Sequence, residues 1–242
     1  MDSSGTVRVS GRPTTRKSRV IARRQQIVRV DRETRDSLPP EAAEQLLARV
    51  RAILERNDAA SSLVLEDYGK GLLSVEVGRA IMKAACARGL PVNVDPKETL
   101  EPFPGASLIK PNLREAEALT GLRASGAGGL EAIGRRLQKL VGGGDVAITQ
   151  GGDGMTIFEG SQPGVYVPTV RQEVFDVQGA GDTIIATLSL ARGAGASLWE
   201  ATVLAHAAAA VVVGKAGTAT ADRDEVRAAL PAIRAFVVEA SA

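Results

Sequence analysis

Short apolar segments alternate with longer helical segments along most of the chain, and this alternation is the strongest constraint on its fold. Apolar residues recur at helical spacing over 40–54, 74–88, 112–120, 130–141, 180–192, 197–213 and from residue 222 onward. Apolar runs typical of buried strands lie at 62–66, 91–95, 106–110, 145–149, 155–159 and 166–168. Strands that alternate with helices form βαβ units, so we predict an α/β fold with a mostly parallel sheet flanked by helices.

The first 35 residues differ in charge from the rest of the chain. They carry ten Lys and Arg against three acidic residues, whereas the remainder has a net charge of −5. A basic arm of this kind can bind nucleic acid. Residues 19–31, however, place Val and Ile among polar residues, which is typical of strands, so we predict two short strands around residues 23–25. A basic arm that binds nucleic acid remains the alternative.

Composition excludes several classes of protein. The 242 residues are 44% hydrophobic, enough for one sizeable core, and the longest apolar run, near 207–213, is too short to span a bilayer. A single cysteine, Cys86, rules out an intrachain disulfide, and the only histidine, His206, is expected to be a packed core residue. Aromatic residues make up 3%, which argues against stacking on single-stranded nucleic acid. We expect a cytoplasmic protein.

Ligands of parallel α/β sheets bind beyond the carboxyl ends of the strands, so the residues that follow each strand are the candidate site. Residues 66–71 place an acid, a phenol and an ammonium where one strand ends, and residues 95–97 place a carboxylate and a cation at the end of the next. Turns rich in Asp and Gly have the same composition, so each pattern alone also fits a simple turn.

Asn112 and Glu115 follow a third strand. Their spacing favours a helix cap, in which Asn112 is the N-cap and Glu115 completes a capping box. The alternative is functional, because an amide and a carboxylate at this position can orient phosphate oxygens and hydrated Mg²⁺.

A glycine-rich segment, 176–183, directly precedes an apolar helix. Two glycines let an anion approach the backbone, and the amides of the first helical turn can bind it. Asp182, in the same turn, can accept a proton from a hydroxyl while the amides hold a transferring phosphoryl group. The chain has no Walker A sequence, so this is not a P-loop site.

Three segments together resemble the ribokinase-like (PfkB) carbohydrate kinases. Residues 176–182, DVQGAGD, are similar to the family's DTGAGD-type signature, 111–115 to its PNxxE element and 149–154 to its TxGxxG turn. The finer resemblance is to the heptose 7-phosphate kinase subgroup, through residues 67–71, 95–97, 172–176 and 212–218. It extends over residues 12–225.

The resemblance implies an ATP-dependent sugar-phosphate kinase. It would transfer the γ-phosphoryl group to the anomeric hydroxyl of D-glycero-β-D-manno-heptose 7-phosphate, or of another sugar. Asp182 would be the general base, and Gly179, Ala180 and Gly181 would form the anion hole. For the remaining sites the resemblance implies these residues: Asn112 and Glu115 for Mg²⁺ and the ATP phosphates; Thr149, Gly151, Gly154 and Gly217 for the nucleotide; Asp67, Lys70 and Lys97 for the sugar phosphate; Asp176 for a monovalent cation such as K⁺.

The resemblance also implies the organisation of the chain. Residues 1–11 would be a flexible N-terminus, 12–35 a remnant of lid strands, and 36–242 the nucleotide-binding core. The family pattern begins upstream of Met1, so we expect a homodimer or a partner chain that supplies the missing part. The alternative is a nucleotide-binding subunit with weak catalysis that acts through association. Two positions depart from the family: Gln178, where Thr is usual, and His206, where Asn is frequent.

Overall fold

The computed structural model describes residues 3–22, 25–56, 60–125, 128–170 and 177–240. Within this part of the chain, a six-stranded sheet has its strands in sequence order. The strands are β3 (Leu63–Glu66), β4 (Val92–Asp95), β5 (Leu108–Ile109), β6 (Asp145–Thr149), β7 (Met155–Phe158) and β8 (Val165–Val167). Pairing is parallel from β3 to β6 and antiparallel for β7 and β8, which confirms the mostly parallel sheet.

The change to antiparallel pairing has a local cause. Only a short 3₁₀ turn, η1 (Gly151–Asp153), separates β6 from β7, and a parallel crossover needs a dozen residues or more. The parallel strands are covered on both faces, since consecutive residues of β6, Val146, Ala147 and Ile148, are all buried. β5 has two residues where the sequence predicted five.

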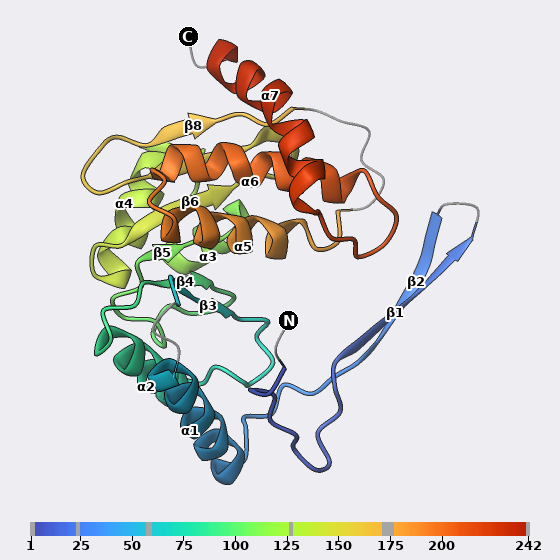
Figure 1. Ribbon diagram of the computed structural model, residues 1–242, viewed down its shortest axis with the longest axis vertical. Helices are drawn as coiled ribbons and strands as arrows, with labels where there is room; N and C mark the ends of the chain where they lie inside the picture. The colour runs from blue at the N-terminus through green and yellow to red at the C-terminus, as the bar shows by residue number, and fades with distance from the viewer. Residues whose placement is uncertain (1–2, 23–24, 57–59, 126–127, 171–176, 241–242) are drawn as a thin grey trace.

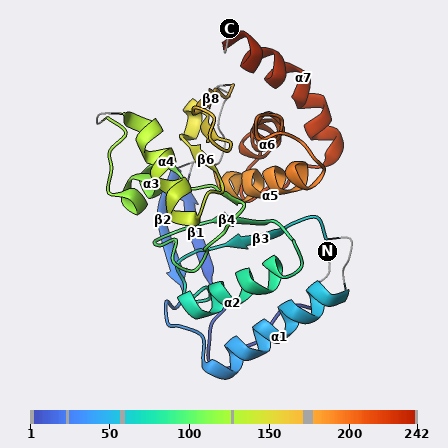
Figure 2. The ribbon, with the colours of Figure 1, turned by 90° about the vertical axis from the view of Figure 1, so that its left-hand side faces the viewer.

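Helices cover the two faces of the sheet, as Figure 2 shows. One face packs against a core to which these helices contribute: α1 (Pro40–Arg56), α2 (Val75–Cys86), α3 (Leu113–Thr120) and α4 (Gly129–Val141). The other face packs against α5 (Ala180–Gly193), α6 (Leu198–Val213) and α7 (Arg223–Ala240). A separate cluster of apolar side chains is thus buried on each face of the sheet. This burial stabilises the sheet and so fixes the positions of its strand ends.

The Ala-rich helix α6 is buried along most of its length because α5 and α7 both pack against it. His206 lies on this helix and is 3% exposed, which confirms the prediction of a core residue. It makes a hydrogen bond to the backbone of Pro168, which has only a carbonyl to accept it. Burial lowers the pKa of His206 to about 4. Of the helices in the described residues, none is both long and apolar enough to cross a membrane.

A separate antiparallel hairpin, formed by β1 (Arg16–Ala22) and β2 (Gln25–Arg32), projects from the body of the molecule (Figure 1). It confirms the two predicted N-terminal strands. Its base is attached to the loop after β3, because Lys70 forms an ion pair with Glu33 (2.5 Å) and Arg12 donates to the Lys70 carbonyl. The hairpin exposes a row of three apolar side chains: Val20, Val28 and Val30.

Candidate active site

The carboxyl ends of the parallel strands bring three charged side chains together. Glu66 ends β3 and lies directly opposite Asp95, which ends β4. Lys110 follows β5, and its ammonium forms an ion pair with Asp95 (Nζ–Oδ2, 2.6 Å). The Lys110 residue is 3% exposed, so this pair is shielded from water. The strand ends thus create a partly buried charge cluster that we call the strand-end triad: Glu66, Asp95 and Lys110.

Glu66 and Asp95 lie side by side at the ends of paired strands, and two neighbouring carboxyls resist being ionised together. Burial, the negative charge of Asp95 and that of Asp182 raise the pKa of Glu66 to about 8. Burial also raises the pKa of Asp95, but the Lys110 ammonium opposes this effect. Because Asp95 has the cationic partner, Glu66 is the neutral member of the pair at pH 7.

Asp182 lies in the first turn of α5 and faces this cluster. Gly179 is the N-cap of α5 with φ of 78°, a left-handed conformation that favours glycine. The Tyr68 hydroxyl donates a hydrogen bond to the Asp182 carboxylate (Oη–Oδ2, 3.0 Å). Desolvation and the Asp182 charge raise the pKa of Tyr68, so the phenol stays protonated and remains a donor. The strand-end segment 66–71 and the glycine-rich segment therefore meet in space.

The turn before α5 has the features of an anion site. Among the residues that the structure describes, the amides of Gly181 and Asp182 have no hydrogen-bond acceptor, as is usual in a first helical turn. A Cβ on Gly181 would lie 3.7 Å from the Lys110 ammonium. Free amides, the helix dipole and a buried cation therefore act at one place, and all three favour a phosphate.

Asn112 and Glu115 form the predicted capping box. The Asn112 side chain accepts from the Glu115 amide, and the Glu115 carboxylate accepts from the Asn112 amide, each at 2.9 Å. The second Glu115 oxygen binds Lys97 (Nζ–Oε1, 2.6 Å). Hydrogen bonding to Glu115 raises the pKa of Lys97. The Asn112 residue remains exposed at the start of this helix.

Thr149 lies beside Asn112, because the two residues form a parallel bridge and the Thr149 amide donates to the Pro111 carbonyl (3.0 Å). In the turn that follows, Gly154 has φ of 113° and lies against the backbone of Val167 and Pro168 at the end of β8. A Cβ there would lie 2.3 Å from the Val167 carbonyl oxygen, so glycine is required by space as well as by conformation.

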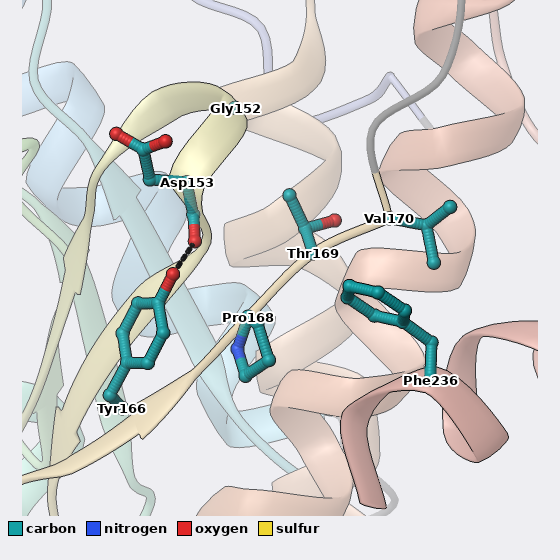
Figure 3. A pocket seen from close by; sticks show the side chains of 7 residues that line it. All are labelled: Gly152, Asp153, Tyr166, Pro168, Thr169, Val170 and Phe236. Carbon is teal, nitrogen blue, oxygen red and sulfur yellow. Dashed lines mark hydrogen bonds between the residues drawn. The ribbon is translucent and has the colours of Figure 1, made fainter. Parts of the chain in front are cut away.

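A cavity of about 330 Å³ lies next to this turn (Figure 3). The Tyr166 hydroxyl donates to the Asp153 carbonyl on one side, and the Phe236 ring lies beside Val170 on the other. Its lining residues are Gly152, Asp153, Tyr166, Pro168, Thr169, Val170 and Phe236. Two aromatic rings and several aliphatic groups suit a flat organic group.

The structure brings four of the residues singled out from sequence into one set of contacts: Asn112 with Glu115 and Thr149, and Glu115 with Lys97. Gly217 is exposed with φ of 72°, and the neighbouring Thr218 methyl lies 3.5 Å from where a Cβ on Gly179 would be. Asp67 accepts from the Gly69 amide (2.8 Å) and so closes the loop that carries Tyr68. The predicted cation residue, Asp176, lies outside the described residues.

Tyr68, Glu66 and Lys110 had no predicted role, although all three stand at strand ends that the sequence marks as candidate sites. Their position there was the available signal, but their partners are not local. Among the described residues, no three His, Cys, Asp or Glu side chains cluster as a metal site would require.

Residues 2–225 match the sequence profile of the pfkB family of carbohydrate kinases. The chain belongs to this family. Its ribokinase-like fold agrees with that membership.

Curated relatives of this pfkB kinase chain are named bifunctional protein HldE. The protein from Wolinella succinogenes is 42% identical over 227 residues, which cover 93% of this chain and 47% of the relative. That from Azorhizobium caulinodans is 43% identical over 224 residues, covering 90% and 45%. The chain therefore spans about half the length of the curated relatives it matches.

Solved structures share the fold at lower identity. Phosphofructokinase-2 from Escherichia coli, in complex with potassium, has a TM-score of 0.71 at 20% identity, covering 82% of this chain and 64% of that one. Ribokinase from Arabidopsis thaliana, complexed with ribose and ATP, has a TM-score of 0.67 at 21% identity, covering 84% and 65%.

Proposed function

We propose that the chain transfers the γ-phosphoryl group of ATP to the anomeric hydroxyl of D-glycero-β-D-manno-heptose 7-phosphate. The choice of sugar is supported by the resemblance of residues 67–71, 95–97 and 212–218 to the heptose kinases, and by about 40% identity to the HldE proteins. The observation that carries the proposal is the Asp182 carboxylate, held by Tyr68 at the edge of an amide turn with Lys110 behind it.

In this proposal Asp182 removes the proton from the sugar hydroxyl. The amides around Gly179, Ala180 and Gly181 bind the phosphoryl oxygens as charge develops on them. Phosphoryl transfer needs mainly positioning and charge neutralisation, and the turn with its buried cation supplies both. The oxygen of the sugar forms the new P–O bond, and the bond from the γ-phosphorus to ADP breaks.

The donor set fits Mg²⁺ held chiefly through ATP. Glu115 supplies a carboxylate and Asn112 an amide oxygen at the rim of the site, and hard oxygen ligands are those that Mg²⁺ prefers. When bound, the ion would neutralise phosphate charge. Lys97 holds the Glu115 carboxylate in place until then.

ATP would extend from this rim toward the turn at 151–154. Thr149, Gly151 and Gly154 would line its path, with Gly217 near the adenine. The cavity beside Tyr166 and Phe236 adds an apolar surface for the nucleoside. We further propose Asp176 as a ligand of a monovalent cation. Activity measured with K⁺ and with Na⁺, in the wild type and in Asp176→Asn, tests that role.

Sugar binding would involve Asp67, Lys70 and Lys97 on the loops after β3 and β4. Lys70 connects this loop to the hairpin through Glu33, so the hairpin would act as a lid over the sugar. We propose that its exposed valines are covered by a second copy of the chain or by a partner chain. Sedimentation of the wild type and of Val30→Asp tests this, and identical monomeric profiles would contradict it.

The test of the reaction is direct measurement of ADP and heptose 1,7-bisphosphate. Asp182→Asn is expected to reduce kcat about 10²- to 10⁴-fold while ATP still binds, because only the base is lost. Asp224→Asn, at an exposed acid in the first turn of another helix, is the matched control and should retain wild-type activity. ATP binding without turnover by the wild type, even with the sugar present, would favour the nucleotide-binding subunit instead.

A further inference from the structure

The strand-end triad lies directly behind the proposed phosphate site, yet the reaction as described does not use Glu66. Glu66 is opposite Asp95 in the sheet register, and Asp95 is the carboxylate that pairs with Lys110. Burying two carboxyls side by side is costly when both are charged. One of the two carboxyls therefore retains its proton. The position of Lys110 determines which of the two does so.

Lys110 can neutralise only one negative charge. Its ammonium is 2.6 Å from Asp95 Oδ2, and 3.7 Å separate it from where a Cβ on Gly181 would lie. When Glu66 is neutral, the triad has no net charge. Asp95 is then the only counterion within the triad for the Lys110 ammonium, which faces the Gly179–Asp182 turn. With Glu66 ionised, the triad has a net charge of −1, close to the negative charge of Asp182.

We propose that Glu66 is a positioning residue for phosphoryl transfer: as the neutral partner of Asp95, it keeps the strand-end triad free of net negative charge and so lets Lys110 attract the phosphate at the Gly179–Asp182 turn. The inference rests on the proposed function of that turn. It goes further by giving the site a built-in sensitivity to alkaline pH.

The charged groups that face Glu66 from the packed elements act in two directions, and those that keep it neutral have the larger effect. Asp95 on β4 and Asp182 on α5 both disfavour the ionised form of Glu66, and Lys110 after β5 favours it. Tyr68 stays protonated over the relevant range because its own pKa is raised. With a pKa of about 8, Glu66 loses its proton just above neutrality.

The test is the pH profile of kcat/KM from pH 6.5 to 9.5, with ADP quantified directly so that no coupling enzyme intervenes. The wild-type value should fall about tenfold between pH 7 and pH 9, as one group titrates. Glu66→Gln, which cannot ionise, should lack this fall relative to its own value at pH 7. Glu44→Gln, at an exposed position on α1, is the matched control and should keep the wild-type profile. Identical profiles for wild type and Glu66→Gln would overturn the proposal.

A second readout needs no turnover and so separates this inference from the proposed function. Because folding raises the pKa of Glu66 from 4.5 to about 8, the folded state binds more protons in that interval, and this contribution to stability declines as pH rises through it. Urea unfolding should show that the wild type loses stability relative to Glu66→Gln between pH 5 and 8. If neither the wild type nor any variant has kinase activity but this difference is present, the proposed protonation of Glu66 is supported and the proposed reaction is wrong. If the difference in stability is absent, the proposal that Glu66 is neutral in the folded protein is wrong.

Discussion

Tyr68 and Asp182 are 114 positions apart in the chain, yet the phenol oxygen of one lies 3.0 Å from a carboxylate oxygen of the other. The contact joins the loop after β3 to the first turn of α5. It orients the carboxylate that we propose as the base. Tyr68 is otherwise largely exposed, so the contact contributes more to the site than to the core.

Tyr68→Phe should therefore lower kcat about tenfold, because a hydrogen bond to a charged group contributes about 1.5 kcal/mol. The free energy of unfolding should change little. Steady-state kinetics and urea unfolding measure the two effects. A variant that unfolds early while keeping wild-type kcat would contradict this view of Tyr68.

Gly181 and Gly179 differ in what a methyl group would do. Gly181→Ala should fold normally, since the added Cβ makes only ordinary contact at 3.7 Å with Lys110. It should nevertheless reduce kcat/KM between about 10- and 10³-fold, because the methyl group obstructs the amides that bind phosphate. Gly179→Ala should in addition lose about 1 kcal/mol of stability, since φ is 78° there. Equal turnover in Gly181→Ala and wild type would count against the anion site.

The glycines of the 151–154 turn offer a similar comparison of stability. Gly154→Ala should cost about 2–4 kcal/mol, because its Cβ would lie 2.3 Å from the Val167 carbonyl at φ of 113°. Gly151→Ala, where φ is 62° and no atom lies within 4 Å, should cost only about 1 kcal/mol. Chemical denaturation of both variants measures the difference, and the reverse order would be inconsistent with the observed turn.

His206 should make the protein sensitive to acid. Its pKa is lowered by burial from 6.5 to about 4 in the folded state, so the unfolded state binds more protons between these values. This contribution to stability is complete above pH 6.5 and is lost as pH falls toward 4. His206→Gln should show a shallower decline over that interval in urea unfolding. Parallel curves for the two proteins would contradict the assignment of a neutral buried imidazole.

Glu115 should control the dependence on Mg²⁺. Glu115→Gln removes the carboxylate proposed to hold the ion but retains oxygen and nitrogen atoms that can preserve part of the capping box. The Mg²⁺ concentration for half-maximal activity should rise about tenfold or more, while chelation by EDTA should abolish activity in the wild type. Glu117→Gln, on the same helix, is the control. An unchanged Mg²⁺ requirement would exclude Glu115 as a ligand.

Much of the secondary structure could be predicted because its signals are local. Asn112 caps α3 and Ser197 caps α6 through bonds to amides three residues away, and glycine ends α3 and α4 at Gly121 and Gly142. The hairpin strands and the parallel β3–β6 pairing follow from apolar periodicity and connection length. The limits of β5 did not follow, because its ladder depends on its neighbours.

The candidate site also combines features set by local sequence with features set by tertiary contacts. The sequence alone determined which residue types stand at the strand ends, since apolar runs, caps and glycines act over a few positions. Only the tertiary structure decided that Tyr68 meets Asp182, that Thr149 lies beside Asn112, and that Lys110 is buried behind Gly181. These contacts depend on the order of strands in the sheet and on the helices packed against it. The packing also withdraws Glu66 from water, and that loss of solvation, absent from any local pattern, is what gives its carboxyl an unusual proton affinity.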